Sequence, residues 1–240
     1  MKIVFLLLFY FSALTVVIGQ EKETVFGFSF KPVISGSLIN EGLAERNEAG
    51  LRVQIPKLFG YSAGMNIRHS FTKRFSIESG IHFVQRNYSF DIDDRNYNIF
   101  TQRSFRVVGY QVPVLALIYV QLTRQIFMDV SFGITADLYP SDVAILDDDL
   151  LAEMRRRNWV SPALEANLGW EWRSKNASTI YLGATYHRPF GDIYYVVFEY
   201  DGDVNDPLNQ EILSDMYFDG NYLTLDFRYF FKPVRKKAVN

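Results

Sequence analysis

The chain contains no cysteine among its 240 residues, so it folds without disulfides, as many exported proteins do. Only three histidines are present, which leaves few candidate bases for catalysis. Beyond the N-terminal segment, no apolar run approaches the roughly 20 residues that a transmembrane helix requires. Any insertion into a membrane must therefore use strands, in which alternation dilutes the apolar residues. The sequence also lacks a nucleic-acid-binding signature and a low-complexity linker.

The N-terminal segment has the pattern of a secretory signal peptide. A basic residue, Lys2, precedes a mostly apolar stretch from Ile3 to Ile18, and the small residue Gly19 follows it. A membrane-anchor helix is the alternative, but the stretch is shorter than the roughly 20 apolar residues that a bilayer needs. We therefore predict cleavage after Gly19, with residues 1–19 as the signal peptide.

Period-two alternation runs through the rest of the chain and predicts β-strands. Successive side chains of a strand point to opposite faces of a sheet. In one segment Phe59, Tyr61 and Met65 lie on one face, while Gly60 and Ser62 lie on the other. Eight such segments occur, within residues 26–31, 59–71, 75–83, 105–121, 126–135, 164–172, 180–187 and 223–231.

The connections between these segments alternate in length. Three are short, at residues 72–74, 122–125 and 174–177, and four are long and mostly acidic, at residues 35–58, 91–103, 139–158 and 189–220. Short periplasmic turns and long extracellular loops are typical of outer-membrane barrels. We predict an all-β fold, an eight-stranded antiparallel up-and-down transmembrane β-barrel over residues 20–231. The bacterial outer membrane would hold it with both mature termini periplasmic, and residues 232–240 would form a basic periplasmic tail.

The composition of the polar faces separates this fold from a soluble barrel. A lipocalin-like barrel turns its apolar face inward around a ligand, so its outer face should be rich in Lys and Glu. Here the polar face is mainly Gly, Ser, Thr and Asn, and Lys31 is its only lysine. Aromatic residues gather at the ends of the apolar faces, as in interfacial girdles: Phe59, Tyr61, Phe71, Phe75, Trp170, Trp172, Phe227, Tyr229 and Phe231.

The predicted interior of the barrel carries a charge network. An eight-stranded barrel is barely wide enough for its own side chains, so inward charges are expected to plug it. Counting back from the turn at residues 72–74 sets Arg68 opposite Glu78, both inward, as a buried ion pair. The other inward residues of the predicted network are His82, Asp129, Glu165, Glu171, Asp226 and Arg228.

The histidines do not form a recognisable catalytic arrangement. On the predicted strands His69 points toward lipid near the periplasmic end, His82 points inward opposite Gly64, and His187 lies near the outer rim without a serine at a suitable spacing. We therefore expect no enzymatic activity, no cofactor and no metal site. A lipid A-modifying activity is the alternative that these histidines leave open.

Two of the long connections have further patterns. Residues 189–220 contain eight acids and no Lys or Arg, and their aromatic residues predict that strands seven and eight project beyond the bilayer as a hairpin. Residues 201–206 begin like a calcium loop, but Asp206 replaces the turn glycine and Ile212 stands where the closing Glu belongs, so we expect no calcium site. Residues 144–157 have acids near their start and arginines at their end, which favours a short helix.

The segment Tyr110 to Leu117 resembles the tyrosine-to-proline strand of the Bacteroidota outer-membrane β-barrel family, described as PorT-like or porin-family. Gln111 stands where that family often has an acidic residue. The resemblance extends over the mature chain in length and strand rhythm, and it implies an eight-stranded outer-membrane barrel. Because Pro113 has no N–H to donate to a sheet, we predict a local bulge there.

Two functional hypotheses follow from these patterns. The first is a non-enzymatic surface barrel whose acidic loops contact outer-membrane lipids, lipopolysaccharide through divalent ions, or an envelope protein partner. The second is a narrow porin or, as the PorT-like resemblance implies, an accessory barrel of a secretion machine. The basic turns and tail at the periplasmic end are expected to meet solvent, anionic headgroups or a periplasmic partner.

Overall fold

A computed structural model describes residues 23–34, 44–48, 50–147, 150–174, 178–201 and 210–232. The predicted signal peptide, nearly all of the predicted basic tail and most of the calcium-like segment lie outside these residues. All regular elements of the described residues are strands. Within the same residues, no helix has the length and apolar character needed to cross a bilayer.

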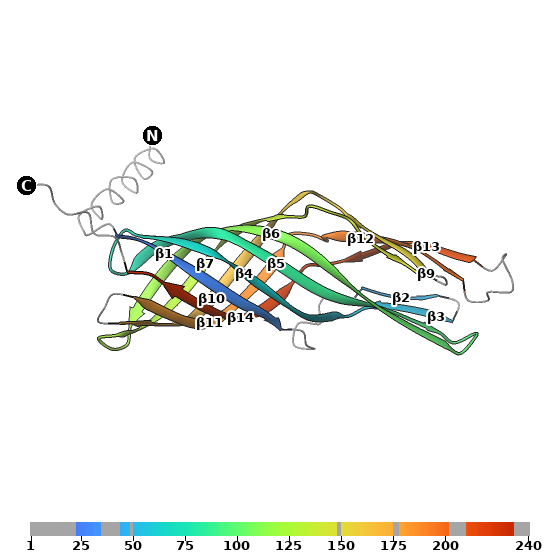
Figure 1. Ribbon diagram of the computed structural model, residues 1–240, viewed down its shortest axis with the longest axis horizontal. Helices are drawn as coiled ribbons and strands as arrows, with labels where there is room; N and C mark the ends of the chain where they lie inside the picture. The colour runs from blue at the N-terminus through green and yellow to red at the C-terminus, as the bar shows by residue number, and fades with distance from the viewer. Residues whose placement is uncertain are drawn as a thin grey trace, which may run out of the picture.

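Eight antiparallel strands form a closed ring, which confirms the predicted fold class (Figure 1). The ring follows the order β5-β4-β1-β14-β11-β10-β7-β6, and the β5–β6 pairing closes it. First and last ring strands are neighbours, with Phe28 opposite Tyr229. The ring strands are β1 (Glu23–Ile34), β4 (Lys57–Ser70), β5 (Phe75–Asp94), β6 (Ile99–Gln121), β7 (Ile126–Leu138), β10 (Val160–Arg173), β11 (Thr179–Pro189) and β14 (Tyr222–Phe230).

Beyond one end of the ring the chain builds a second body of strands, which we term the extension (Figure 1). It comprises residues 88–94 of β5 and 99–107 of β6 together with six shorter strands. Two of these, β2 (Ala44–Glu48) and β3 (Leu51–Ile55), pair beside β5. The other four form a separate sheet in the order β13-β12-β9-β8. They are β8 (Val143–Leu146), β9 (Leu150–Arg156), β12 (Tyr194–Asp201) and β13 (Gln210–Phe218).

Two of the long connections are strands rather than the loop and helix that the sequence predicts. Residues 91–103 continue the β5–β6 ladder up to the pair Asp94 and Ile99. The predicted helix within residues 144–157 is also wrong, because this segment forms the β8–β9 hairpin. Leu150, Ala152 and Met154 alternate on the buried side of β9 and pack into an apolar core. Burial of this period-two face outweighs the charge arrangement that favours a helix.

The predicted projecting hairpin is present, with β12 paired to β13 from Tyr194 and Phe218 to Asp201 and Gln210. It belongs to the separate sheet, where β12 also pairs with β9. The predicted bulge at Pro113 is wrong. Pairing with β7 stays in register through Pro113, and pairing with β5 keeps one register on both sides of it. The missing N–H interrupts the ladder there without inserting a residue.

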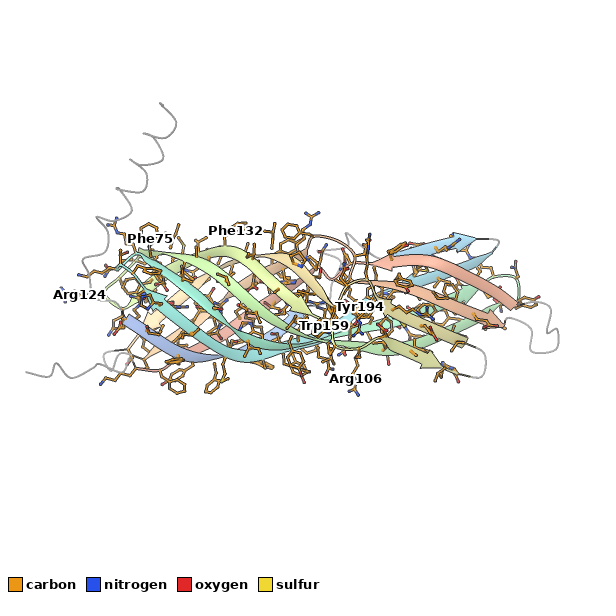
Figure 2. The ribbon with its side chains drawn as sticks, turned by 90° about the horizontal axis from the view of Figure 1, so that it is seen from above. Phe75, Arg106, Arg124, Phe132, Trp159 and Tyr194 are labelled. Carbon is orange, nitrogen blue, oxygen red and sulfur yellow. The ribbon has the colours of Figure 1, made fainter. Side chains whose placement is uncertain are left out.

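The two faces of the ring differ in the way that a membrane barrel requires. Large apolar side chains point outward around the ring, such as Phe75 and Phe132, which are 49% and 58% exposed (Figure 2). Polar and charged side chains point inward and are buried. The apolar face therefore looks away from the interior, and the soluble lipocalin-like alternative is wrong. A belt of this kind is stable only against acyl chains, because water would leave its apolar area unburied.

Candidate functional site

The interior of the ring holds a continuous series of close contacts between ionisable side chains, most of them ion pairs, which we term the charge ladder. Inward positions of seven ring strands contribute to it, because alternation directs every second side chain of each strand into the lumen. The ladder runs along the barrel from the short turns to the base of the extension. Its members in order of contact are Arg173, Glu171, Arg68, Glu78, Arg228, Asp226, Lys31, Glu165, His187, Asp137 and Arg86.

The end of the ladder nearest the short turns is centred on Arg68 of β4. Its guanidinium lies 2.7 Å from a carboxylate oxygen of its register partner Glu78 and also donates a hydrogen bond to Glu171 of β10. Glu171 accepts a second hydrogen bond, of 3.1 Å, from the partly exposed Arg173. Glu78 likewise accepts one of 2.8 Å from Arg228 of β14. Each of these buried carboxylates therefore meets two cations.

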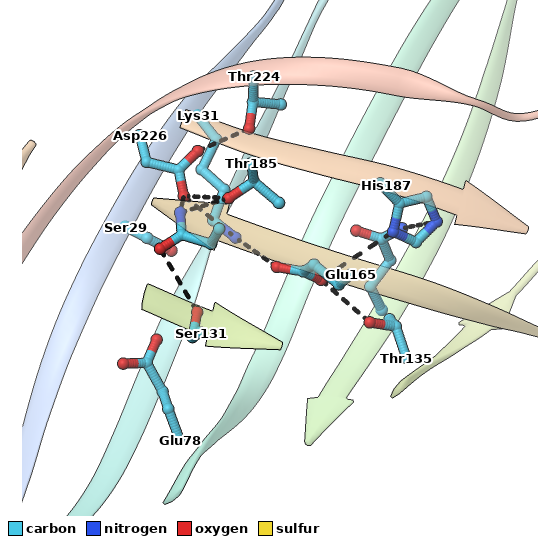
Figure 3. A network of polar contacts seen from close by, with 12 residues as sticks. Ser29, Lys31, Glu78, Ser131, Thr135, Glu165, Thr185, His187, Thr224 and Asp226 are labelled. Carbon is cyan, nitrogen blue, oxygen red and sulfur yellow. Dashed lines mark hydrogen bonds and ion pairs between the residues drawn. The ribbon is translucent and has the colours of Figure 1, made fainter. Parts of the chain in front are cut away.

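The middle of the ladder joins strands from opposite sides of the ring (Figure 3). Arg228 donates a 2.6 Å hydrogen bond to Asp226 on its own strand. Lys31 of β1 then bridges two acids, with its Nζ 3.7 Å from Asp226 and 3.4 Å from Glu165 of β10. The hydroxyl of Thr135 donates to the other oxygen of Glu165 at 3.0 Å. The lysine thus links β1 to β10 across the interior.

An amide and a phenol fill the space beside these charges. Asn167 donates a hydrogen bond to Asp226 at 3.2 Å and accepts one of 2.6 Å from the Tyr181 hydroxyl. A Cβ atom at Gly169 or Gly183 would lie within 2.3 Å or 2.1 Å of that hydroxyl oxygen. The two glycines therefore leave the room in which the buried Tyr181 ring lies across the lumen.

The end of the ladder nearest the extension is organised around Asp137 of β7. His187 of β11 lies with Nε2 2.9 Å from Asp137. Its Nδ1 is 4.0 Å from Glu165 (Figure 3). Arg86 of β5 reaches the same Asp137 at 3.2 Å and donates a 2.7 Å hydrogen bond to the Tyr139 hydroxyl. These buried side chains lie in the lumen where the ring meets the extension.

All eight residues of the sequence-predicted network lie inside the ring and are buried, but two stand apart from the ladder's hydrogen bonds. Asp129 is 3.8 Å from Arg68, and neither of its carboxylate oxygens has a hydrogen-bond partner within the described residues. His82 faces Gly64 across the β4–β5 ladder, and its Nε2 has no partner within the same residues. The other six are linked by the contacts given above.

Five ladder members were not part of the predicted network, namely Lys31, Arg86, Asp137, Arg173 and His187. The period-two alternation of the strands already indicated two of these residues. Arg86 continues the inward face of Glu78 and His82, and Asp137 continues that of Asp129. Extending each strand by a few residues would have found both. The link between Lys31 and Glu165 depends on how the closed ring brings β1 across from β10, which no local pattern encodes.

The arrangement pairs opposite charges in the interior of the ring. His187 and Asp137 form a pair, but within the described residues no hydrogen bond connects His187 to a serine. His69 points outward and shares a 2.8 Å hydrogen bond with Thr24. No group of three or more His, Asp or Glu side chains in the described chain has metal-binding geometry. Buried opposite charges in such contact hold each other in place, since removing one leaves its partner unpaired.

The extension has an apolar core beyond the adjoining end of the ladder. Tyr88 and Phe90 of β5 face Phe198 of β12 and Phe218 of β13, and the Phe90 and Phe198 rings meet edge to face at 5.3 Å. Burial raises the pKa of Tyr88 to about 12 and that of Tyr194 to about 12. Both phenols are therefore protonated wherever the extension is folded at neutral pH.

Comparison with known proteins supports the fold. No protein-family model matches the chain, and no curated protein matches it. The outer membrane protein OprG from Pseudomonas aeruginosa is 12% identical with a TM-score of 0.52, over 89% of this chain and 97% of that one. The outer membrane protein AlkL, determined by solid-state NMR in DMPC lipid bilayers, is 12% identical with a TM-score of 0.52, over 91% and 94%. The chain is similar to both in fold.

Proposed function

We propose that this protein is a non-enzymatic outer-membrane barrel that does not conduct solutes and that presents its extension outside the cell. The observation that carries the proposal is the uninterrupted charge ladder. A wide pore needs an open aqueous lumen, whereas here buried side chains fill the interior from Arg68 to Arg86. The ring then serves as a membrane anchor, and the extension carries the contacts with other molecules.

We infer the orientation of the barrel in the membrane from the difference between the two ends of the ring. The end with short turns carries basic residues such as Arg74 and Arg124, while the other end carries the long connections that build the extension (Figures 1 and 2). Outer-membrane barrels have short periplasmic turns and longer extracellular segments. We therefore place the extension outside the cell and both mature termini in the periplasm.

The extension is suited to binding because it has a buried core and carries exposed apolar side chains. Its buried core fixes two sheets against each other, and Arg103 of β6 pairs with Asp147 beyond β8. On its surface Phe100 is 65% exposed and Leu146 is 79% exposed. Exposed apolar groups on a rigid surface favour protein contacts. An envelope or cell-surface protein is the partner class that this surface supports.

Conductance in planar lipid bilayers tests the closed lumen. We expect the full-length protein to give no steady current, and we expect a variant that removes a central cation, Arg228→Ser, to conduct. Arg155→Ser, on the exposed surface of the extension, is the matched control and should behave as the parent does. A steady current from the parent would overturn the proposal in favour of a narrow porin.

Affinity capture from native membranes addresses the remaining alternative. A partner retained by the parent and lost when the exposed Phe100 and Leu146 are changed to Ser would support the surface role. Stable recovery of the barrel with secretion components, unaffected by these changes, would favour an accessory barrel of a secretion machine, as the PorT-like resemblance implies.

A further inference from the structure

A groove of about 430 Å³ lies on the outside of the molecule where the ring meets the extension. Its lining comes from the ends of β10 and β11 and from the residues around the start of β14, including Leu164, Arg188, Phe190, Asp192 and Asp219. The groove is separate from the charge ladder, whose members point into the lumen. It belongs to the outward-facing surface at the end of the lipid-facing belt.

One wall of the groove is apolar and exposed. Leu164 is on the outward face of β10. The side chain of Phe190 is 63% exposed, and its backbone N–H donates a 3.1 Å hydrogen bond to the Pro162 carbonyl. Trp159, immediately before β10, is 65% exposed at the junction of ring and extension (Figure 2). Exposed aromatic rings at this level are typical of the membrane–water interface, where one side meets acyl chains and the other meets headgroups.

The other wall carries charged side chains, and its two carboxylates are paired with cations. Asp192 is paired with Arg157 at 3.4 Å, and Asp219 is paired with Lys57 at 2.8 Å. The guanidinium of Arg188 is exposed and forms no hydrogen bond or ion pair with any described residue. Arg188 is therefore the charged lining residue that has no partner among the described residues, and it lies beside an apolar wall.

Arg188 also points toward lipid. It continues the outward face of β11 after Leu182, Ala184 and Tyr186, as alternation requires. A guanidinium at this level meets the headgroup layer, where phosphate accepts two parallel N–H bonds from its planar fork. Basic pockets beside membrane-spanning segments recognise anionic headgroups in this way.

We propose that this groove binds a phosphate-bearing glycolipid of the outer leaflet. Arg188 holds the phosphate, and an acyl chain lies along Leu164 and Phe190. The inference goes beyond anchoring and presentation, and it rests on the proposed orientation, in which this rim of the ring lies in the outer leaflet.

Native mass spectrometry of the full-length barrel in detergent tests the inference with two defined probes. These are bis-phosphorylated lipid A and the same lipid with both phosphates removed. We expect the parent to retain lipid A and to bind the phosphate-free lipid about tenfold more weakly, since a charge-assisted contact contributes about 1.4 kcal/mol or more. Arg188→Gln should lose the same factor for lipid A and none for the phosphate-free lipid.

Arg106→Gln is the matched control for charge. Arg106 is an exposed, outward-facing arginine of β6 that does not line the groove, and Figure 2 shows it pointing away from the body near the same junction. This variant should bind lipid A within twofold of the parent. Phe190→Ala should weaken both probes while preserving the preference for phosphate.

Equal losses in the Arg188 and Arg106 variants would overturn the proposal, because general electrostatic attraction would then explain binding. Equal binding of both probes by the parent would overturn it as well. The orientation is checked separately with Asn98→Cys, a single thiol at the β5–β6 turn of a cysteine-free chain, labelled by an impermeant reagent on intact cells. Labelling together with unselective lipid binding would refute this inference alone, whereas failure to label would refute the orientation of the proposed function.

Discussion

Two strands, β5 and β6, run through both the ring and the extension, and on β5 the polarity of the two faces is opposite in the two bodies. On β5 the inward face carries Glu78, His82 and Arg86 within the ring and then Phe90 and Ile92 within the extension, all of them buried. The outward face of the ring is apolar, whereas that of the extension is largely polar. Side chains of β5 keep the same inward and outward alternation along the whole strand, and only the polarity of each face changes. The surrounding medium, lipid or water, therefore determines which face is apolar.

The change takes place at a layer of cations and aromatic rings. The Arg86 guanidinium is 5.5 Å from the centre of the Tyr139 ring and 4.9 Å from that of Tyr222. Such cation–π contacts allow a charged group to lie where the polar interior of the ring meets the apolar core of the extension. On the ring side of this layer, the interior is stable because opposite charges are paired. On the extension side, it is stable because apolar area is buried.

Breaking the ladder is expected to have the largest effect. Arg68→Ala leaves Glu78 and Glu171 without their shared cation in a buried site. We expect the barrel to lose about 3–5 kcal/mol of unfolding free energy, as when one partner of a buried pair is removed. Urea unfolding of the detergent-refolded protein, followed by heat-modifiable electrophoretic migration, measures the loss. The exposed Arg155→Ala should change it by less than about 1 kcal/mol, and a similar value for Arg68→Ala would refute the role of the ladder.

Breaking the apolar core is expected to unfold the extension alone. Phe198 is 1% exposed and packs on Phe90. Phe198→Ala should destabilise the extension by about 3–5 kcal/mol through lost contacts and a cavity. Limited proteolysis should then cleave β12 while the ring stays folded and retains its heat-modifiable migration. Loss of both bodies together would mean that ring and extension unfold as one unit.

The outward faces provide the next test. Phe132 lies midway along β7 on the lipid-facing side, so Phe132→Arg should cost about 2–4 kcal/mol in a bilayer. Leu146→Arg, on the water-facing side of the extension, should change stability by less than about 0.5 kcal/mol. Folding yields into lipid vesicles at increasing urea concentration measure both. Equal costs at the two sites would contradict the inversion of polarity.

Alkaline pH is expected to destabilise the extension more than the ring, and this is the smallest of the expected effects. Burial raises the pKa of Tyr88 and Tyr194 to about 12, compared with about 10 for an unfolded tyrosine. The folded extension holds these protons more tightly, so their contribution to stability is complete below about pH 10 and is lost as the pH rises through 12. Proteolysis of the extension should increase over that range. An extension already cleaved at neutral pH would contradict the buried phenols.

The sequence predicted the ring more completely than the extension, for a physical reason. Three short turns each join two ring strands into a pair, so alternation and turn length set the faces of these strands and the register within each pair, as at Arg68 and Glu78. The extension depends on pairing between distant segments, such as Tyr194 with Arg156, whose partners no local pattern identifies. The acids and arginines of residues 144–157 favoured a helix because the facing sheet that buries Met154 could not be foreseen. For the same reason Lys31 was seen as inward without its link to Glu165.

Site-directed spin labelling along β5 tests the central claim most directly, because the cysteine-free chain accepts single labels from Phe75 to Asp94. The polarity inversion predicts that outward labels from Phe75 to Phe83 collide preferentially with oxygen dissolved in lipid. Outward labels at Asp91 and Asp93 should instead collide preferentially with a water-soluble nickel complex, while inward labels are shielded from both throughout. Nickel access at the Phe75 to Phe83 positions, or oxygen preference that persists to Asp93, would contradict a barrel whose polarity reverses between ring and extension.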